Sequence, residues 1–231
     1  MIVNSKIDYC SCCGNYTEIL FGIENYDLSQ LDLKNYIKYK DIYVYTCRKC
    51  GMISTNLTTQ DKSLYESVRH TDRFKDIMSY EYLEGYDLEL YENHTRSVPA
   101  NLYDAYAMMY EKSSDKETYL RSLYRSIQLK EVAIEKYQIE FEEDEGDEEE
   151  EEILSNLEDL MYENIEEARK SFNDVFLQFE DKNEFLFLMY VENLVGLEDY
   201  KNAKDNLNWI IKNYKLSDDL IEYMQNLTNE E

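Results

Sequence analysis

The cysteines of the chain have the spacing of a four-thiolate metal site. All five lie within the first 50 of the 231 residues, and four of them form two Cys-x-x-Cys-Gly motifs. In such a knuckle the first thiolate ends a strand, and the turn brings the second thiolate alongside it. The glycine that follows (Gly14 or Gly51) lets the backbone take a positive φ, which points amide N–H groups at the sulfurs. The predicted ligands are Cys10, Cys13, Cys47 and Cys50.

Four thiolates in a tetrahedron are typical of structural Zn²⁺, with Zn–S distances of about 2.3 Å. Iron also suits four thiolates and is the alternative metal. Two disulfides would need an oxidising compartment, and thioredoxin-like chemistry uses one such motif in a βαβ context. Four cysteines leave no open position for water or substrate, so we expect a metal that folds its domain and does not catalyse.

The fifth cysteine, Cys12, lies inside the first motif. It lacks the standard spacing to a partner, so we predict a free thiol. The alternative is a spare ligand that replaces Cys10 or Cys13.

Two β-rich segments would position these thiols. Residues 41–46 (Asp-Ile-Tyr-Val-Tyr-Thr) lead directly into Cys47, and residues 16–23 are the predicted partner strand. Residues 1–60 carry six acidic and six basic side chains, so this part has no formal net charge. We therefore predict a zinc-ribbon domain over residues 1–60.

From about residue 58 the apolar residues follow a helical period. Pro99 suits the first turn of a helix over 99–112, and the residues 113–115 break it and cap the next helix, which extends to about 141. Further apolar stripes predict helices over 153–179, 183–195, 200–214 and 220–227. Gly196 is the predicted C-cap of the helix over 183–195. The predicted fold class is therefore α with a small β part.

The net charge of −26 lies entirely in residues 61–231, where 11 acids fall within residues 140–152. We expect that acidic segment to be a solvated, mobile connector, because like charges repel each other. An acidic surface repels phosphate, so nucleic acid is an unfavourable partner for residues 61–231, as is an anionic membrane. A basic partner is favoured instead.

An internal repeat links two of the predicted helices. The pattern Ile165-x-x-Ala168-x-x-x-Phe172 matches Tyr200-x-x-Ala203-x-x-x-Leu207 at an offset of 35 residues. The tetratricopeptide period is 34 residues, with a small residue that lets the paired helices approach closely. The repeat predicts a tetratricopeptide-like helical domain over 61–231, and the alternative is an irregular helical bundle.

Taken together, these features resemble domain-of-unknown-function family 2225, whose members are mostly bacterial. The resemblance is carried by Cys10–Gly14, Asp41–Gly51, the helix pair 99–141 and the Tyr200–Ala203 helix. The family usually has Pro after the first cysteine of a knuckle, where this chain has Ser11 and Arg48. The resemblance implies a zinc ribbon followed by tetratricopeptide-like helices, and it implies no reaction.

The sequence carries no catalytic motif that would make it an enzyme. It has neither a glycine-rich phosphate loop nor a nucleophile elbow, and its two histidines, His70 and His94, lie in polar surroundings. We therefore expect a non-enzymatic interaction or scaffold protein that binds a protein or peptide partner through the helical repeats. The alternative is a regulator that touches nucleic acid through the ribbon or mimics nucleic acid with its acids. Without an apolar targeting or spanning segment, the expected location is the cytoplasm.

Overall fold

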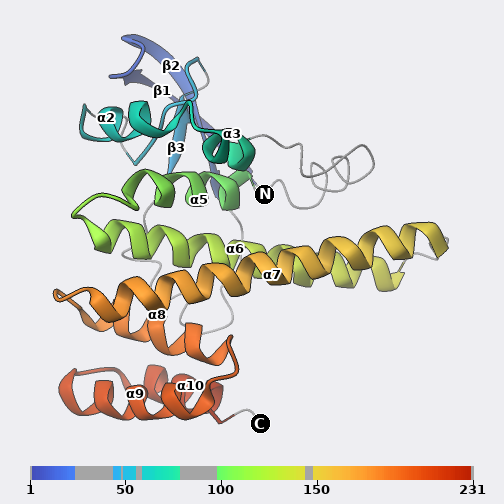
Figure 1. Ribbon diagram of the computed structural model, residues 1–231, viewed down its shortest axis with the longest axis vertical. Coiled ribbons are helices and arrows are strands. Elements are labelled where there is room, and N and C mark those ends of the chain that lie inside the picture. Colours follow the sequence, from blue (N-terminus) through green and yellow to red (C-terminus); the bar gives the residue numbers. More distant parts are fainter. Residues whose placement is uncertain are drawn as a thin grey trace. The chain divides into compact units, whose positions relative to one another are not determined.

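The computed structural model describes residues 2–23, 44–47, 49–55, 59–78, 98–143 and 148–229 (Figure 1). This part of the chain forms eight helices and four short strands, which confirms the prediction of a mostly helical protein with a small β part. Contacts divide the described residues into unit 1, which ends at residue 165, and unit 2, which begins at residue 166. The independent domains 1–60 and 61–231 stay a prediction.

Unit 1 begins with a four-stranded antiparallel sheet in the order β1-β2-β3-β4. The strands are β1 (Ile2–Cys10), β2 (Asn15–Ile23), β3 (Tyr45–Cys47) and β4 (Ile53–Ser54). The predicted strand over 16–23 corresponds to β2. Of the predicted strand over 41–46, residues 45–46 lie in β3, residue 44 is described but lies outside the strand, and residues 41–43 are outside the described residues. Strand β1 was not predicted from the sequence, although it pairs with β2 along its full length.

Four helices follow the sheet in unit 1: α2 (Thr59–Val68), α3 (Asp72–Met78), α5 (Val98–Tyr110) and α6 (Lys116–Glu143). The predicted cap between α5 and α6 is present, because Oδ1 of Asp115 accepts a hydrogen bond from the backbone N–H of Thr118. Small buried residues lie on both of these helices, including Ala105 on α5 and Ser122 on α6, and they allow the two helices to approach closely. Lys130 and Asp104 add an ion pair of 2.6 Å between them.

Most of the acidic segment 140–152 is helical. Helix α6 continues to Glu143 and α7 (Glu148–Gln178) begins at Glu148, so that only residues 144–147 lie outside the described part of the segment. Glutamate has a high helix propensity throughout this segment, and the acids in the first turn of α7 also interact favourably with the dipole of that helix, whereas those in the last turn of α6 do not. These two local effects outweigh the like-charge repulsion on which the expectation of a mobile connector rested.

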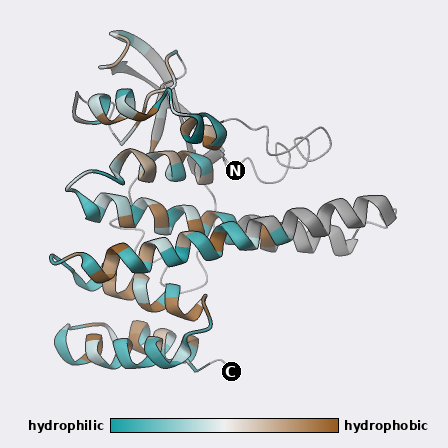
Figure 2. Cartoon of the chain, in the orientation of Figure 1, coloured by the Kyte–Doolittle hydropathy of each residue, from teal (hydrophilic) through white to brown (hydrophobic). Residues whose placement is uncertain are grey.

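Unit 2 contains the end of α7, α8 (Glu184–Val195), α9 (Tyr200–Asn213) and α10 (Asp218–Leu227). A polar side chain caps the start of each of the last three helices: Asn183, Asp199 and Ser217. Helix α8 is mostly apolar, as Figure 2 shows, and residues 188–194 are all buried. Among the helices that the structure describes, none has both the length and the apolar composition to cross a membrane.

Gly196 follows α8, as predicted, but it is needed for a different reason. Its φ is −66°, which any residue adopts, and the positive φ of this turn belongs to Glu198. A Cβ at position 196 would lie 2.2 Å from Cζ of Arg169, whose buried guanidinium donates to Oδ1 of Asn193 at 2.8 Å and to the carbonyl of Glu192 at 3.3 Å. The glycine thus makes room for an arginine that covers the end of α8.

Replacing Gly196 with alanine is expected to lower the free energy of unfolding by about 1–3 kcal/mol, the usual cost of overpacking. The variant is compared with wild type by urea denaturation followed by circular dichroism. In an Arg169→Ala background the same change is expected to be neutral or stabilising, because alanine is favoured over glycine at a helical φ. An equal loss in both backgrounds would show that Arg169 is not the cause.

Candidate metal centre

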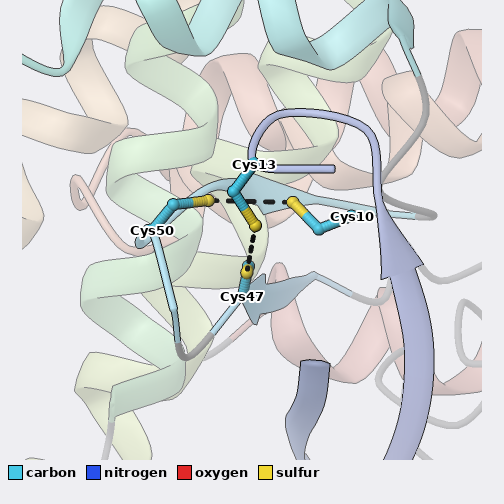
Figure 3. Close-up of side chains that lie close together, drawn as sticks. All are labelled: Cys10, Cys13, Cys47 and Cys50. Carbon is cyan, nitrogen blue, oxygen red and sulfur yellow. Dashed lines mark hydrogen bonds between the residues drawn. The ribbon is translucent and has the colours of Figure 1, made fainter. Parts of the chain in front are cut away.

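The structure brings the four predicted ligands together in unit 1 (Figure 3). Their Sγ atoms all lie within 4.8 Å of one another. The Sγ atoms of Cys10 and Cys50 are 3.7 Å apart, and those of Cys13 and Cys47 are 4.0 Å apart. We call Cys10, Cys13, Cys47 and Cys50 the four-thiol cluster.

These separations fit a bound metal and do not fit disulfides. Sulfurs at the corners of a tetrahedron with metal–sulfur bonds of about 2.3 Å lie roughly 3.8 Å apart. A disulfide would need about 2.05 Å, and all five cysteines are free. The four-thiol cluster could therefore hold a metal ion, and within the described residues it is the one such group of His, Cys, Asp or Glu side chains.

The two glycines of the knuckles have the backbone conformation that the sequence predicts. Gly14 has a φ of 67° and Gly51 a φ of 71°. Their amides donate to the carbonyls of the first cysteine in each motif, Gly14 to Cys10 at 2.9 Å and Gly51 to Cys47 at 2.8 Å. Each turn thereby closes on itself and places its second thiol next to its first.

The surroundings of the cluster differ from thiol to thiol. Cys10 and Cys47 are completely buried, and Sδ of the equally buried Met52 lies 3.9 Å from Sγ of Cys10. Burial raises the pKa of the Cys10 and Cys50 thiols. At Cys13 burial also acts to raise the pKa, but hydrogen bonds from the side chain and backbone of Asn15 outweigh it and lower the pKa to about 7. A cation would compensate the charge of the Cys10 and Cys50 thiolates, which burial otherwise disfavours.

Cys12 does not belong to the four-thiol cluster. It is half-buried and forms no disulfide, as is true of the other four cysteines, so the free thiol stays a prediction. His70 is exposed, and its Nε2 accepts a hydrogen bond of 3.0 Å from Nε of Arg69. His94 lies outside the described residues.

Tyr65 connects the second knuckle to the helices of unit 1. From α2 its hydroxyl donates to the carbonyl of Cys50 at 2.7 Å. The buried ring packs edge-on against Phe74 of α3, with 5.8 Å between the ring centroids. The backbone of the metal centre is therefore held from the helical side by one buried tyrosine.

A buried carboxylate, Asp61, lies four residues before Tyr65 on α2 and is 3% exposed. Its Oδ2 accepts from the Ser54 hydroxyl of β4 at 2.5 Å and from Tyr106 of α5 at 3.1 Å, and its Oδ1 accepts from Tyr110 of α5 at 2.5 Å. We call these four residues the Asp61 joint. The sequence does not reveal this group, because nothing in it distinguishes one buried acid among 50.

The Asp61 joint predicts a loss of stability at alkaline pH. Burial, with the negative Asp61, raises the pKa of Tyr106 from 10.0 to about 12, although its hydrogen bond with Tyr110 opposes the shift. Below pH 10 the hydroxyl is protonated in both states. From pH 10 to pH 12 it ionises only in the unfolded chain, so the folded state loses stability.

Urea denaturation at pH 9 and at pH 11.5 gives the free energy of unfolding of wild type and of Tyr106→Phe. The effect of Tyr106 is the difference between the two proteins in how much this free energy falls from pH 9 to pH 11.5. We expect the variant to lose less unfolding free energy between the two pH values than wild type does. An identical loss in the two proteins would contradict the assignment to Tyr106.

A second notable group is aromatic and lies in unit 2. Phe187 of α8, Trp209 of α9 and Tyr214 at the end of α9 form the Trp209 cluster, with centroid distances of 4.7 to 6.0 Å. Phe187 also contacts the buried Phe176 at 5.2 Å, whereas Trp209 is 45% exposed. The cluster therefore extends the core of unit 2 to its surface.

Comparison with known proteins gives no match: no family model, no curated protein and no solved structure is significantly similar to the chain. Its function is therefore inferred from these sites.

Proposed function

We propose that this chain is a non-enzymatic interaction protein in which a structural zinc ion organises the ribbon and the helical repeats bind a protein or peptide partner. The observation that carries the proposal is the four-thiol cluster, with all Sγ atoms within 4.8 Å of one another. Four cysteine ligands leave no coordination position for a substrate, which supports a structural role and no catalytic one.

Zinc is proposed over iron because an ion without redox chemistry suits a site whose task is folding. The experiment is elemental analysis of protein purified without added metal, combined with its visible absorption spectrum. We expect about one zinc per chain and a colourless sample. A coloured sample with about one iron per chain would replace zinc by iron, and a metal-free folded chain would overturn the metal site.

The burial pattern of unit 2 supports the tetratricopeptide-like reading of its helices. Phe172 on α7 and Leu207 on α9 occupy equivalent positions of the 35-residue offset, and both are buried. The small Ala203 is completely buried, as expected where two helices approach closely. Helices α8 and α9 are joined by residues 196–199, a connection short enough for an antiparallel pair. The resemblance to domain-of-unknown-function family 2225 implies the same arrangement and is kept as part of this proposal.

The Trp209 cluster is the proposed contact site for the partner. Exposed tryptophan and tyrosine are enriched where proteins bind each other, because they bury a large rigid surface. The chain has a net charge of −26, so a basic partner is favoured and salt is expected to weaken the complex.

Site-directed photo-crosslinking in the native host tests this contact site. A benzophenone amino acid replaces Trp209, and the control carries it at Tyr162, an aromatic residue of unit 1 that is 48% exposed. We expect a discrete adduct from position 209 that decreases as salt is raised and is absent from position 162. No adduct at 209, or equal adducts at both positions, would contradict the assigned surface.

Contact with nucleic acid through the ribbon is the second candidate. Its specific support is the cross-strand pair of Tyr9 (50% exposed) and Tyr16 (77% exposed) beside the first knuckle, since exposed aromatic rings stack on unpaired bases. A mobility shift of single-stranded RNA at low salt that Tyr16→Ala abolishes would favour it. The absence of any shift would reject it.

A further inference from the structure

The contacts around the metal centre connect it to helices outside the ribbon. The second knuckle precedes β4, and β3 and β4 contain only three and two residues. Strand β4 pairs with β3, and β3 is joined to β2 through only two residue pairs, so this edge of the sheet has few backbone contacts of its own. The position of β4 therefore depends on the knuckle, and the knuckle depends on its metal.

Helix α2 docks on this segment through two side chains on one face. Asp61 and Tyr65 are four residues apart, and residues at this spacing lie one above the other on a helix. Asp61 accepts from Ser54 of β4, and Tyr65 donates to the Cys50 carbonyl in the knuckle. With ten residues, α2 is too short to be stable as an isolated helix, so these contacts hold it in place.

Helix α5 docks on α2 through the same carboxylate. Tyr106 and Tyr110, again four residues apart, both donate to Asp61, and both are at most 3% exposed. Tyr103, one turn before them, is also buried. We call Tyr103, Tyr106 and Tyr110 the tyrosine face of α5. If β4 and α2 detach from α5, Asp61 moves away with α2, and the tyrosine face becomes exposed to solvent.

We propose that metal occupancy of the four-thiol cluster controls the docking of α2 and α3 and thereby the exposure of the tyrosine face of α5. The chain of contacts runs from the knuckle through Tyr65 and Asp61 to Tyr106 and Tyr110. Loss of the metal would therefore expose a helical surface in unit 1. None of the side chains in this chain of contacts belongs to unit 2, so unit 2 is expected to be unaffected. The inference rests on the proposed metal site.

Hydrogen–deuterium exchange on the full chain tests the coupling. The loaded protein is compared with protein stripped by a strong chelator, and the metal content is measured in the same samples. Stripping is expected to accelerate exchange at least tenfold in residues 44–55, 59–78 and 98–110. Residues 184–227 are expected to keep their exchange rates.

Tyr65→Phe tests the connecting residue without removing a thiol. We expect it to retain the metal and to exchange at least tenfold faster than loaded wild type over residues 59–78. Tyr190→Phe, which removes the hydroxyl of a buried tyrosine in unit 2, is the matched control and is expected to leave residues 59–78 unchanged.

Two outcomes would overturn the inference, and they are distinguishable. If stripped protein exchanges faster only in residues 44–55, or if Tyr65→Phe exchanges like wild type over 59–78, the metal site stands and the coupling fails. If no preparation contains metal, the proposed function fails and the coupling fails with it.

Discussion

Replacing Cys50 with serine is expected to abolish metal binding and to unfold the part of the sheet of unit 1 that β3 and β4 form. Structural zinc contributes an apparent binding free energy of about 10–16 kcal/mol in small domains, which is comparable to the whole stability of a domain, about 5–15 kcal/mol. The loss of one of four ligands therefore removes most of what holds two short strands together. Elemental analysis and exchange over residues 44–55 measure the result, and the helices of unit 2 are expected to stay folded.

Cys12→Ser is the matched control for this change. It removes a thiol from the same segment, but this thiol lies outside the four-thiol cluster. The variant is expected to bind metal as wild type does. A Cys12→Ser protein that loses its metal, or a Cys50→Ser protein that keeps it, would contradict the ligand assignment.

Asp61→Ala is expected to lower the unfolding free energy of unit 1 by at least about 1–3 kcal/mol, the usual cost of leaving a buried hydrogen-bond donor without its acceptor. Three O–H groups lose the acceptor to which they donate, and a cavity forms between α2 and α5. Chemical denaturation followed by tyrosine absorbance measures the change. Metal content is measured in parallel, so that destabilisation is separated from loss of the metal.

Asp205→Ala controls for the removal of an acid. Asp205 is exposed on α9, where a substitution is expected to change stability by no more than about 0.5 kcal/mol. If both variants were equally stable, the buried hydrogen bonds of Asp61 would contribute nothing, and α2 would be held by its other contacts, which include the hydrogen bond from Tyr65 to Cys50.

The four-thiol cluster could be predicted from the sequence because its chemistry is local. Two cysteines at a spacing of three residues, followed by glycine, define a turn that needs little help from the rest of the fold. The helices from α5 onward could be predicted, apart from their extension into the acidic segment, for a similar reason: apolar periodicity and caps act within one or two turns. Such features can be predicted without knowing which distant segments of the chain pack against each other.

Features that depend on distant segments could not be predicted. Strand β1 has a mixed polar sequence and becomes a strand through its pairing with β2. The environment of Asp61 arises from β4, α2 and α5 together, and its neighbours in the sequence do not reveal it. Gly196 could be placed at a helix end, but its contact with Arg169 comes from another helix 27 positions earlier. In each case the local structure is determined by contacts with segments far away in the sequence, and the neighbouring residues do not reveal those contacts.

The position of Trp209 has one practical consequence. It is the single tryptophan of the chain, and it lies half-exposed in unit 2 against Phe187 and Tyr214. With excitation at the red edge of its absorption, its fluorescence reports the state of unit 2 with no signal from the tyrosines of unit 1. One unmodified side chain thus serves as a built-in optical probe that separates a change near the partner surface from a change near the metal.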